Sequence, residues 1–212
     1  MSIEAQFGDE ARARIAEAVR RAEALSRGQI VPVVVGKSDP YPEARWRGGL
    51  LAVAAVTVAL LGASVPVAPW ELPLFQLAAG IVGALVATWD PVERLLAGRR
   101  AMDEAVRNRA LRAFHEQGLQ RTEEGTGVLV FAALFERQAV VLGDHGIHAR
   151  MGDDWNQAVG ALVAGLRAGD AARGFVDAIA ICGARLAEHF PRDPSSRPPR
   201  NELEDQIRTS AT

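Results

Sequence analysis

Two long uncharged stretches constrain the fold of this chain more than any other feature. Residues 48–70 contain no Asp, Glu, Lys or Arg, and residues 72–89 contain none either, so that only Glu71 separates the two stretches. An α-helix rises ~1.5 Å per residue, so eighteen residues reach about 27 Å, close to the ~30 Å hydrocarbon core of a bilayer. We therefore predict a transmembrane helical hairpin over residues 46–90, with spans at about 48–67 and 72–89.

The residues that flank these stretches suit a membrane boundary. Tryptophan favours the membrane interface, and Trp46, Trp70 and Trp89 stand where the two helices would meet it. The connection between the spans contains no Lys or Arg, whereas arginines lie outside both spans, at positions Arg45, Arg47, Arg94, Arg99 and Arg100. By the positive-inside rule, both termini and the soluble domain are expected in the cytoplasm, with the hairpin in the cell (cytoplasmic) membrane.

The composition of the two spans is typical of an anchor. Gln76 is their only strongly polar side chain and no ionisable residue lies deep in them, whereas pumps and pores need such groups. The small-residue pairs Ala79/Gly83 and Gly80/Ala84 allow close helix packing, either within the hairpin or between copies of the chain. The alternative is a helical hairpin buried in a soluble core, but core helices rarely carry uncharged runs of this length.

Outside the hairpin, helical and extended patterns alternate. Residues 1–39 form the first part of a soluble domain, residues 91–190 form its second part, and residues 191–212 form a Pro-, Ser- and charge-rich tail expected to be flexible. Hydrophobic periodicity predicts helices over 9–28, 91–118 (one helix, or two with a break at Gly98), 154–169 and 170–190, and strands over 29–36, 128–134 and 139–143. Asp9 and Asp170 are the expected N-caps, and Gly28 and Gly169 the expected terminators.

The order of these elements predicts an α/β fold. The first strand, the helix that follows the hairpin and the second strand form a right-handed parallel unit if they share a sheet, and the second and third strands form an antiparallel pair. Helices then cover an α/β/α-type sandwich with a small mixed sheet, interrupted by the two-helix transmembrane hairpin. Neither soluble half can bury its strands alone, so both must lie on the same side of the membrane. The hairpin thus occupies a surface connection of the domain.

Composition and motifs narrow the classes of function. The net charge of −2 offers no basic surface for nucleic acid, and the chain lacks the glycine-rich phosphate loops of nucleotide-binding proteins. We therefore expect no nucleic-acid partner and no nucleotide cofactor. The N-terminus lacks the apolar segment of a signal peptide. Cys182 is the sole cysteine and lies in an apolar helical pattern, which predicts a buried, inert thiol.

Several stretches give the chain a resemblance to a known family. They are IAEAVRRAEALSRGQIVPVVV from Ile15, GTGVLVFAALFERQAVVLGDHGI from Gly125, GDDW from Gly152, the Gly169–Asp170 pair with Phe175 and Ile179, and NEL from Asn201. In this order they resemble the TPM-domain family, in particular a short bacterial membrane-anchored subgroup with a hydrophobic hairpin in the same connection. The chain departs from the family at Gln29, where an acidic residue is usual, which weakens any cation site that this acid would serve.

The resemblance implies three possible activities: acid phosphatase activity, calcium binding, and assembly or repair of membrane complexes. The densest polar cluster, Asp144 to Asp154, follows a predicted strand, where ligands often bind in α/β folds. Asp144 with Asp153 or Asp154 could hold calcium or magnesium through oxygen atoms, although Asp153 is also a natural helix N-cap. Arg137, at the turn between two strands, is a candidate for binding an anion or for an internal ion pair.

Zinc is a weaker alternative at the same cluster. His145 and His148 form an H-x-x-H pair, but no cysteine and no third histidine stands nearby in the sequence. The function that the sequence favours is a membrane-anchored TPM-like domain, a binding or accessory module for membrane-protein assembly or maintenance, with the lipid bilayer and an integral membrane protein or a second copy as partners. The alternative is a metal-assisted, acid phosphatase-like hydrolase that uses Asp144, Asp153 and Asp154.

Overall fold

A computed structural model describes residues 7–63, 66–122, 125–151, 154–192 and 207–210. The chain divides into two compact units. The first, called here the α/β unit, combines Met1–Ser38 with Glu104–Thr212, and the second, the hairpin unit, is Asp39–Asp103. The α/β unit is therefore assembled from two separate segments of the chain, as the sequence predicts for the soluble domain.

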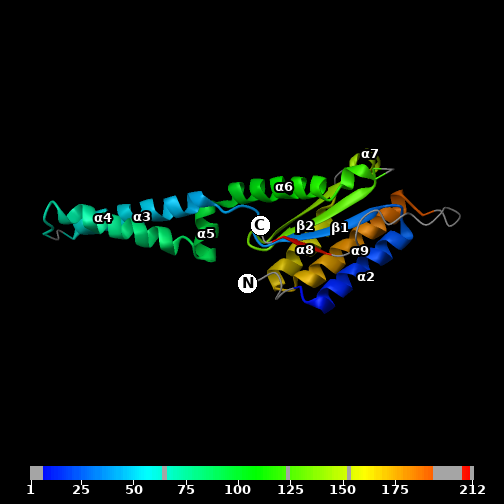
Figure 1. Cartoon of the computed structure of the whole chain (residues 1–212), viewed down its shortest axis with the longest axis horizontal. Helices are drawn as coiled ribbons and strands as arrows, with labels where there is room; N and C mark the ends of the chain where they lie inside the picture. The colour runs from blue at the N-terminus through cyan, green and yellow to red at the C-terminus, as the bar shows by residue number, and fades with distance from the viewer. Residues whose placement is uncertain (1–6, 64–65, 123–124, 152–153, 193–206, 211–212) are drawn as a thin grey trace. The chain divides into compact units, whose positions relative to one another are not determined.

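A small mixed sheet forms the centre of the α/β unit (Figure 1). Its strands are β1 (Gln29–Val35), β2 (Gly127–Ala133), β3 (Gln138–Gly143) and β4 (Arg208–Ser210), in the order β3-β2-β1-β4. β1 and β2 are parallel in a register that pairs Gln29 with Gly127, and β2 and β3 are antiparallel. The predicted parallel and antiparallel pairs are both confirmed.

Helices bury both faces of this sheet. Figure 1 shows α2 (Asp9–Leu25), α8 (Asn156–Ala168) and α9 (Ala171–His189) on one side and α6 (Arg99–Glu116) on the other. Successive side chains of a strand point to opposite faces, and β2 sends Val128, Val130 and Ala132 toward α2, α8 and α9. Its alternate residues Leu129, Phe131 and Ala133 pack with the side chains of α6. The mixed α/β fold with helices on both faces is thus confirmed.

The helix ends follow the predicted chemistry in most places. The Asp170 carboxylate accepts a hydrogen bond from the Arg173 backbone N–H at 3.0 Å, and Gly169 ends α8 with φ of 79°. Gly98, with φ of 82°, separates α5 (Asp90–Ala97) from α6. The prediction for Asp9 is wrong, because Gly8 is the N-cap of α2 and makes no side-chain cap. Gly28 lies beyond the end of α2 at Leu25, and its missing side chain leaves room for another side chain, that of Leu186.

The end of the chain contributes a strand that the sequence does not reveal. We predicted a flexible tail over residues 191–212, yet β4 pairs in parallel with Val33–Val35 of β1, and Ile207 beside it is buried. An unpaired strand edge presents free backbone N–H and C=O groups, so a short segment of almost any sequence can bind there. Pro32 precedes the part of β1 that pairs with β4, at a position where the missing backbone N–H of proline breaks no β1–β4 pairing.

The hairpin unit contains α3 (Pro42–Gly62), α4 (Glu71–Val86) and α5. Among the described residues, α3 is the one helix that is long and apolar enough to cross a membrane by itself. α4 reaches the required length only together with α5, and the two are bent by 100°. The predicted two-span hairpin over 48–67 and 72–89 is therefore not supported in full, because α3 alone among the described helices has the length and composition of a span. α3 ends at Gly62, the helical part of the second predicted span ends at Val86, and the chain then turns sharply into α5.

Two glycines inside α8 give a test of the packing between α8 and α9. A Cβ at Gly165 would lie 2.5 Å from the Gly174 Cα atom of α9, whereas a Cβ at Gly160 would meet no atom within 4 Å. We expect Gly160→Ala to stabilise the protein by roughly 0.5–1 kcal/mol through its better helix propensity. Gly165→Ala should destabilise it by about 1–3 kcal/mol because the two helices must separate. Denaturant unfolding of both variants measures the difference, and equal effects would contradict the packing.

Candidate functional site

Asp144 joins the end of β3 to the helix α7 (His145–Met151). Its backbone N–H donates to the Gly127 carbonyl at 2.9 Å, and its Oδ1 atom accepts from the His145 backbone N–H at 2.7 Å. The residue is only 7% exposed. Its second oxygen, Oδ2, is buried and has no hydrogen-bond partner among the described residues. Asp144 therefore starts α7 with one oxygen and leaves a buried acceptor on the other.

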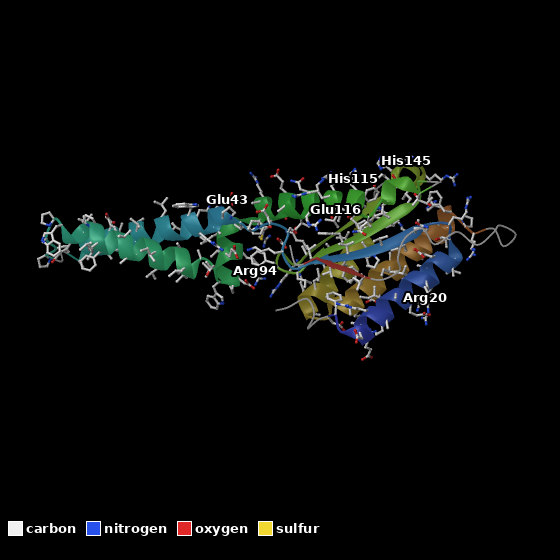
Figure 2. The ribbon with its side chains drawn as sticks, viewed as in Figure 1. Arg20, Glu43, Arg94, His115, Glu116 and His145 are labelled. Carbon is white, nitrogen blue, oxygen red and sulfur yellow. The ribbon has the colours of Figure 1, made fainter. Side chains whose placement is uncertain are left out.

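His145 covers the loop that precedes β2. Its Nδ1 atom lies 3.0 Å from Asp144 Oδ1, while most of the ring is exposed (Figure 2 labels it at α7). A Cβ at Gly125 would lie 2.5 Å from the His145 Cε1 atom, and Gly125 has φ of 63°. The ring can rest on this loop only because residue 125 has no side chain, and Gly125 also supplies the left-handed backbone that glycine tolerates best.

The remaining predicted carboxylates do not complete a cation site in the described part of the chain. Asp154 is exposed, and its oxygens are used by Asn156 Nδ2 at 2.9 Å and Arg185 Nη2 at 3.4 Å. Asp153 lies outside the described residues, as do Gly152 and Asn201 of the family-like stretches. Within the described ranges no group of three or more His, Cys, Asp or Glu residues could hold a metal ion. Calcium or magnesium binding at Asp144, Asp153 and Asp154 stays a prediction, and so does the zinc alternative at His145 and His148.

Arg137 stands apart from Asp144. It occupies the turn between β2 and β3 with φ of 53°, before the first residue of β3, whereas Asp144 follows the last. A strand rises about 3.3 Å per residue, so six strand residues place the two positions roughly 20 Å apart. The structure therefore does not bring Arg137 and Asp144 into one anion- or metal-binding cleft.

A polar contact at the carboxyl end of β1 and β2 was missed by the sequence analysis. Glu136 is buried, and its Oε1 atom accepts from the Ser38 backbone N–H at 2.8 Å. Nearby, the Lys37 ammonium lies 4.4 Å from the centre of the Phe135 ring, within the range of a cation–π contact. The signal in the sequence is a carboxylate directly after a long apolar strand. The contact ties the exit of β1 to the β2–β3 turn.

Glycines form the seam between α3 and α4. A Cβ at Gly83 would lie 2.5 Å from the Gly48 carbonyl oxygen, and one at Gly49 would lie 3.1 Å from the Gly80 carbonyl oxygen. The two backbones approach this closely only because these positions lack side chains. The small-residue packing predicted for Gly80 and Gly83 thus occurs within the hairpin, the first of the two alternatives that the sequence left open.

A hydrogen bond between two polar side chains joins α3 and α4. Gln76 Nε2 of α4 donates to Thr57 Oγ1 of α3 at 3.0 Å, and Thr57 Oγ1 donates to the Val53 carbonyl at 2.8 Å. The hydrogen bond between the two helices gives the amide nitrogen of Gln76, the one strongly polar side chain of the predicted spans, an acceptor. In a hydrocarbon environment an unsatisfied amide would cost several kcal/mol.

Large apolar side chains cover the outside of this hairpin. The exposed leucine, isoleucine, valine and phenylalanine residues of α3 and α4 are Leu50, Leu51, Val58, Leu61, Leu74, Phe75, Leu77, Ile81, Val82, Leu85 and Val86. Small residues thus line the seam and large apolar residues face outward, the reverse of the pattern in a helical hairpin that is stable in water. A continuous apolar surface of this kind marks an interaction with a membrane or another protein.

The comparisons with known proteins define the fold and leave the family open. No family model matches the chain, and no curated protein matches it. The structure is similar to the NMR structure of the BA42 protein from the psychrophilic bacterium Bizionia argentinensis, with a TM-score of 0.60 and 21% sequence identity over 99% of each chain. At this identity the likeness shows a shared fold alone.

The glycine seam makes a direct prediction about the hairpin. Gly83→Ile should force α3 and α4 apart, whereas Gly62→Ile, where a Cβ meets no atom within 4 Å, should leave them in contact. We expect a short bifunctional thiol reagent to join cysteines placed at positions 57 and 76 in the parent protein and in the Gly62 variant. The yield should fall several-fold in the Gly83 variant. Equal yields in all three proteins would contradict the packing of the seam.

Asp144 can be tested for both of its possible roles. Asp144→Ala removes the acceptor at the start of α7 and should cost about 1 kcal/mol of stability, and Asp144→Asn should cost less because it keeps one oxygen. Calorimetric titration with calcium and with magnesium tests the metal prediction. Binding to the parent protein that Asp144→Asn abolishes would place a cation at Asp144, and no binding to the parent protein would reject the metal prediction.

Proposed function

We propose that the chain is a membrane-anchored binding or accessory module, whose α/β unit acts in the assembly or maintenance of membrane proteins at the cytoplasmic face of the inner membrane. The observation that carries the proposal is the arrangement of the hairpin, with glycines inside and large apolar side chains outside. Lipid tails solvate such a surface, whereas in water it would favour aggregation.

The topology of the sheet supports a hairpin that enters the membrane and returns. β1 precedes the hairpin and β2 follows it, yet the two strands pair along seven residues each. Both ends of the inserted segment must therefore lie on the same side of the bilayer. The arginines on both sides of the hairpin support the cytoplasm as that side, by the positive-inside rule.

The functional part of the proposal comes from the resemblance to TPM domains, since their association with assembly and repair of membrane complexes suits an anchored domain. The partner would be an integral membrane protein or a second copy of the chain. The alternative, a metal-assisted phosphatase, is favoured by one observation: the buried Asp144 Oδ2 atom is an oxygen ligand that a hard cation could use. The separation of Arg137 from Asp144 counts against a shared catalytic cleft.

The proposal predicts how the protein partitions and what it binds. The full-length chain should stay in bacterial membranes after an alkaline carbonate wash, and a chain with residues 42–97 replaced by a flexible linker should be released. Recovery of the full-length chain in the wash would reject the anchor.

The accessory role needs a separate measurement. After mild detergent extraction, an integral membrane protein or a second copy should co-purify with the full-length chain. The same partner should also bind a matched chain in which an unrelated two-span hairpin replaces residues 42–97, because the α/β unit makes the contact. A partner lost with the native hairpin would assign the binding to the hairpin instead, and a clean monomer in both proteins would contradict the accessory role.

A further inference from the structure

The short helix α5 lies beside the part of α3 where the charged residues give way to the apolar run, at Arg47 and Gly48. Arg47 Nη1 donates to the Ala97 carbonyl at 3.1 Å and also to the Leu96 carbonyl, so that an arginine of α3 caps the last turn of α5. The Leu96 side chain rests on Gly48, whose Cβ would lie 3.3 Å from the Leu96 Cδ1 atom. Since Arg47 is the last charged residue before the apolar run, these contacts hold the end of α5 at the boundary of the proposed span.

The direction of α5 suits a position in the plane of the membrane surface. α4 packs along α3, and α5 is bent by 100° from α4. If α3 and α4 cross the bilayer, α5 therefore runs nearly parallel to its surface. Amphipathic helices in this position bury an apolar face at the boundary between headgroups and acyl chains.

The exposed side chains near α5 are those that the interface favours. Leu95 is 80% exposed, although Glu93 and Ala97 on the opposite side of the same helix are buried. Trp89, at the start of α5, is 68% exposed, and Trp46, beside the capping residue Arg47, is 81% exposed. Tryptophan and leucine at this level are costly in water and favourable at the headgroup level of a bilayer.

The segments around α5 and the start of α3 carry a net positive charge. Residues 43–47 and 89–100 contain five arginines, Arg45, Arg47, Arg94, Arg99 and Arg100, and three carboxylates, Glu43, Asp90 and Glu93. Arg45, Arg99 and Arg100 are exposed, whereas Arg47 is engaged with the α5 carbonyls. Guanidinium groups bind phosphate oxygens in a bidentate manner, and basic residues close to a membrane surface attract anionic lipids.

We propose that α5 is an interfacial helix that lies in the membrane surface and that, with Arg45, Arg99 and Arg100, it binds the headgroups of anionic phospholipids. This inference rests on the proposed function, because a hairpin outside the bilayer would not bring α5 to a lipid surface. It adds a binding site and a ligand class to the anchor. The apolar residues Trp46, Trp89 and Leu95 set the depth of the helix, and the arginines select the lipid.

Three variants, each with one fluorescent label at a different position, test this inference separately from the proposed function. The native thiol does not interfere, because burial raises the pKa of Cys182 to about 12. In vesicles of phosphatidylcholine and phosphatidylglycerol, an NBD label on Val58→Cys should be quenched best by lipids brominated deep in the acyl chain. A label on Leu95→Cys should be quenched best by lipids brominated near the headgroup, and a label on Gln157→Cys, an exposed position in α8, by neither.

The outcomes of this experiment are distinct. If brominated lipids quench the label at position 58 but not the label at position 95, the interfacial helix is overturned and the anchor is kept. If brominated lipids quench neither label, the anchor and the inference are overturned together. The predicted pattern, deep at 58 and shallow at 95, supports both.

The choice of lipid is tested by energy transfer from tryptophan to pyrene-labelled lipids in the same vesicles. The native chain should prefer phosphatidylglycerol to phosphatidylcholine by at least roughly fivefold, because each basic residue near a membrane surface contributes about 1 kcal/mol. The triple variant Arg45→Gln, Arg99→Gln, Arg100→Gln should lose this preference. A variant with the same change in net charge, Arg12→Gln, Arg14→Gln, Arg167→Gln, should keep it. No preference in the native chain, or equal preference in both variants, would overturn the assignment of the headgroup site.

Discussion

The parallel pairing of β1 with β2 is the constraint on which the rest of the structure depends. These strands are separated in the sequence by about ninety residues that include the whole hairpin unit, yet they pair in register along their length. Both strands are buried on both faces, so neither has a stable position without the other. Because the two strands belong to one sheet, the segments before and after the hairpin unit fold together, and the hairpin unit interrupts the α/β unit without dividing it.

The hairpin and the α/β unit distribute their apolar side chains in opposite ways. In the α/β unit, large apolar side chains such as Phe131 and Phe175 are fully buried, and most charged residues of its described part are at least partly exposed. In the hairpin, glycines occupy the seam and large apolar side chains face outward. One chain thus contains a largely polar surface and a continuous apolar surface. Arg47, which caps α5, is the last charged residue before the apolar run of α3.

Sequence reasoning predicted most of the fold because its signals were local. The apolar runs of β1 and β2 and the capping residue Asp170 appear in the structure as expected. The break at Gly98, one of two alternatives that the sequence left open, also occurs. β4 was not predicted, because its position depends on the free edge of β1 and its own sequence carries no strand signal. The bend after Val86 was not predicted either. An uncharged run indicates that its residues favour an apolar environment, but it does not indicate where the helix changes direction. At the candidate site, sequence placed Arg137 before β3 and Asp144 after it, but could not show that the Asp144 Oδ2 atom is buried without a hydrogen-bond partner among the described residues.

The most direct test of this account is to remove the hairpin unit. A chain in which Ser38 is joined to Arg99 through a short glycine–serine linker retains both segments that form the sheet. The account predicts a soluble protein with the circular dichroism of a mixed α/β fold and a single cooperative unfolding transition without detergent or lipid. Aggregation, or unfolding without cooperativity, would contradict the claim that the α/β unit is complete without the hairpin unit.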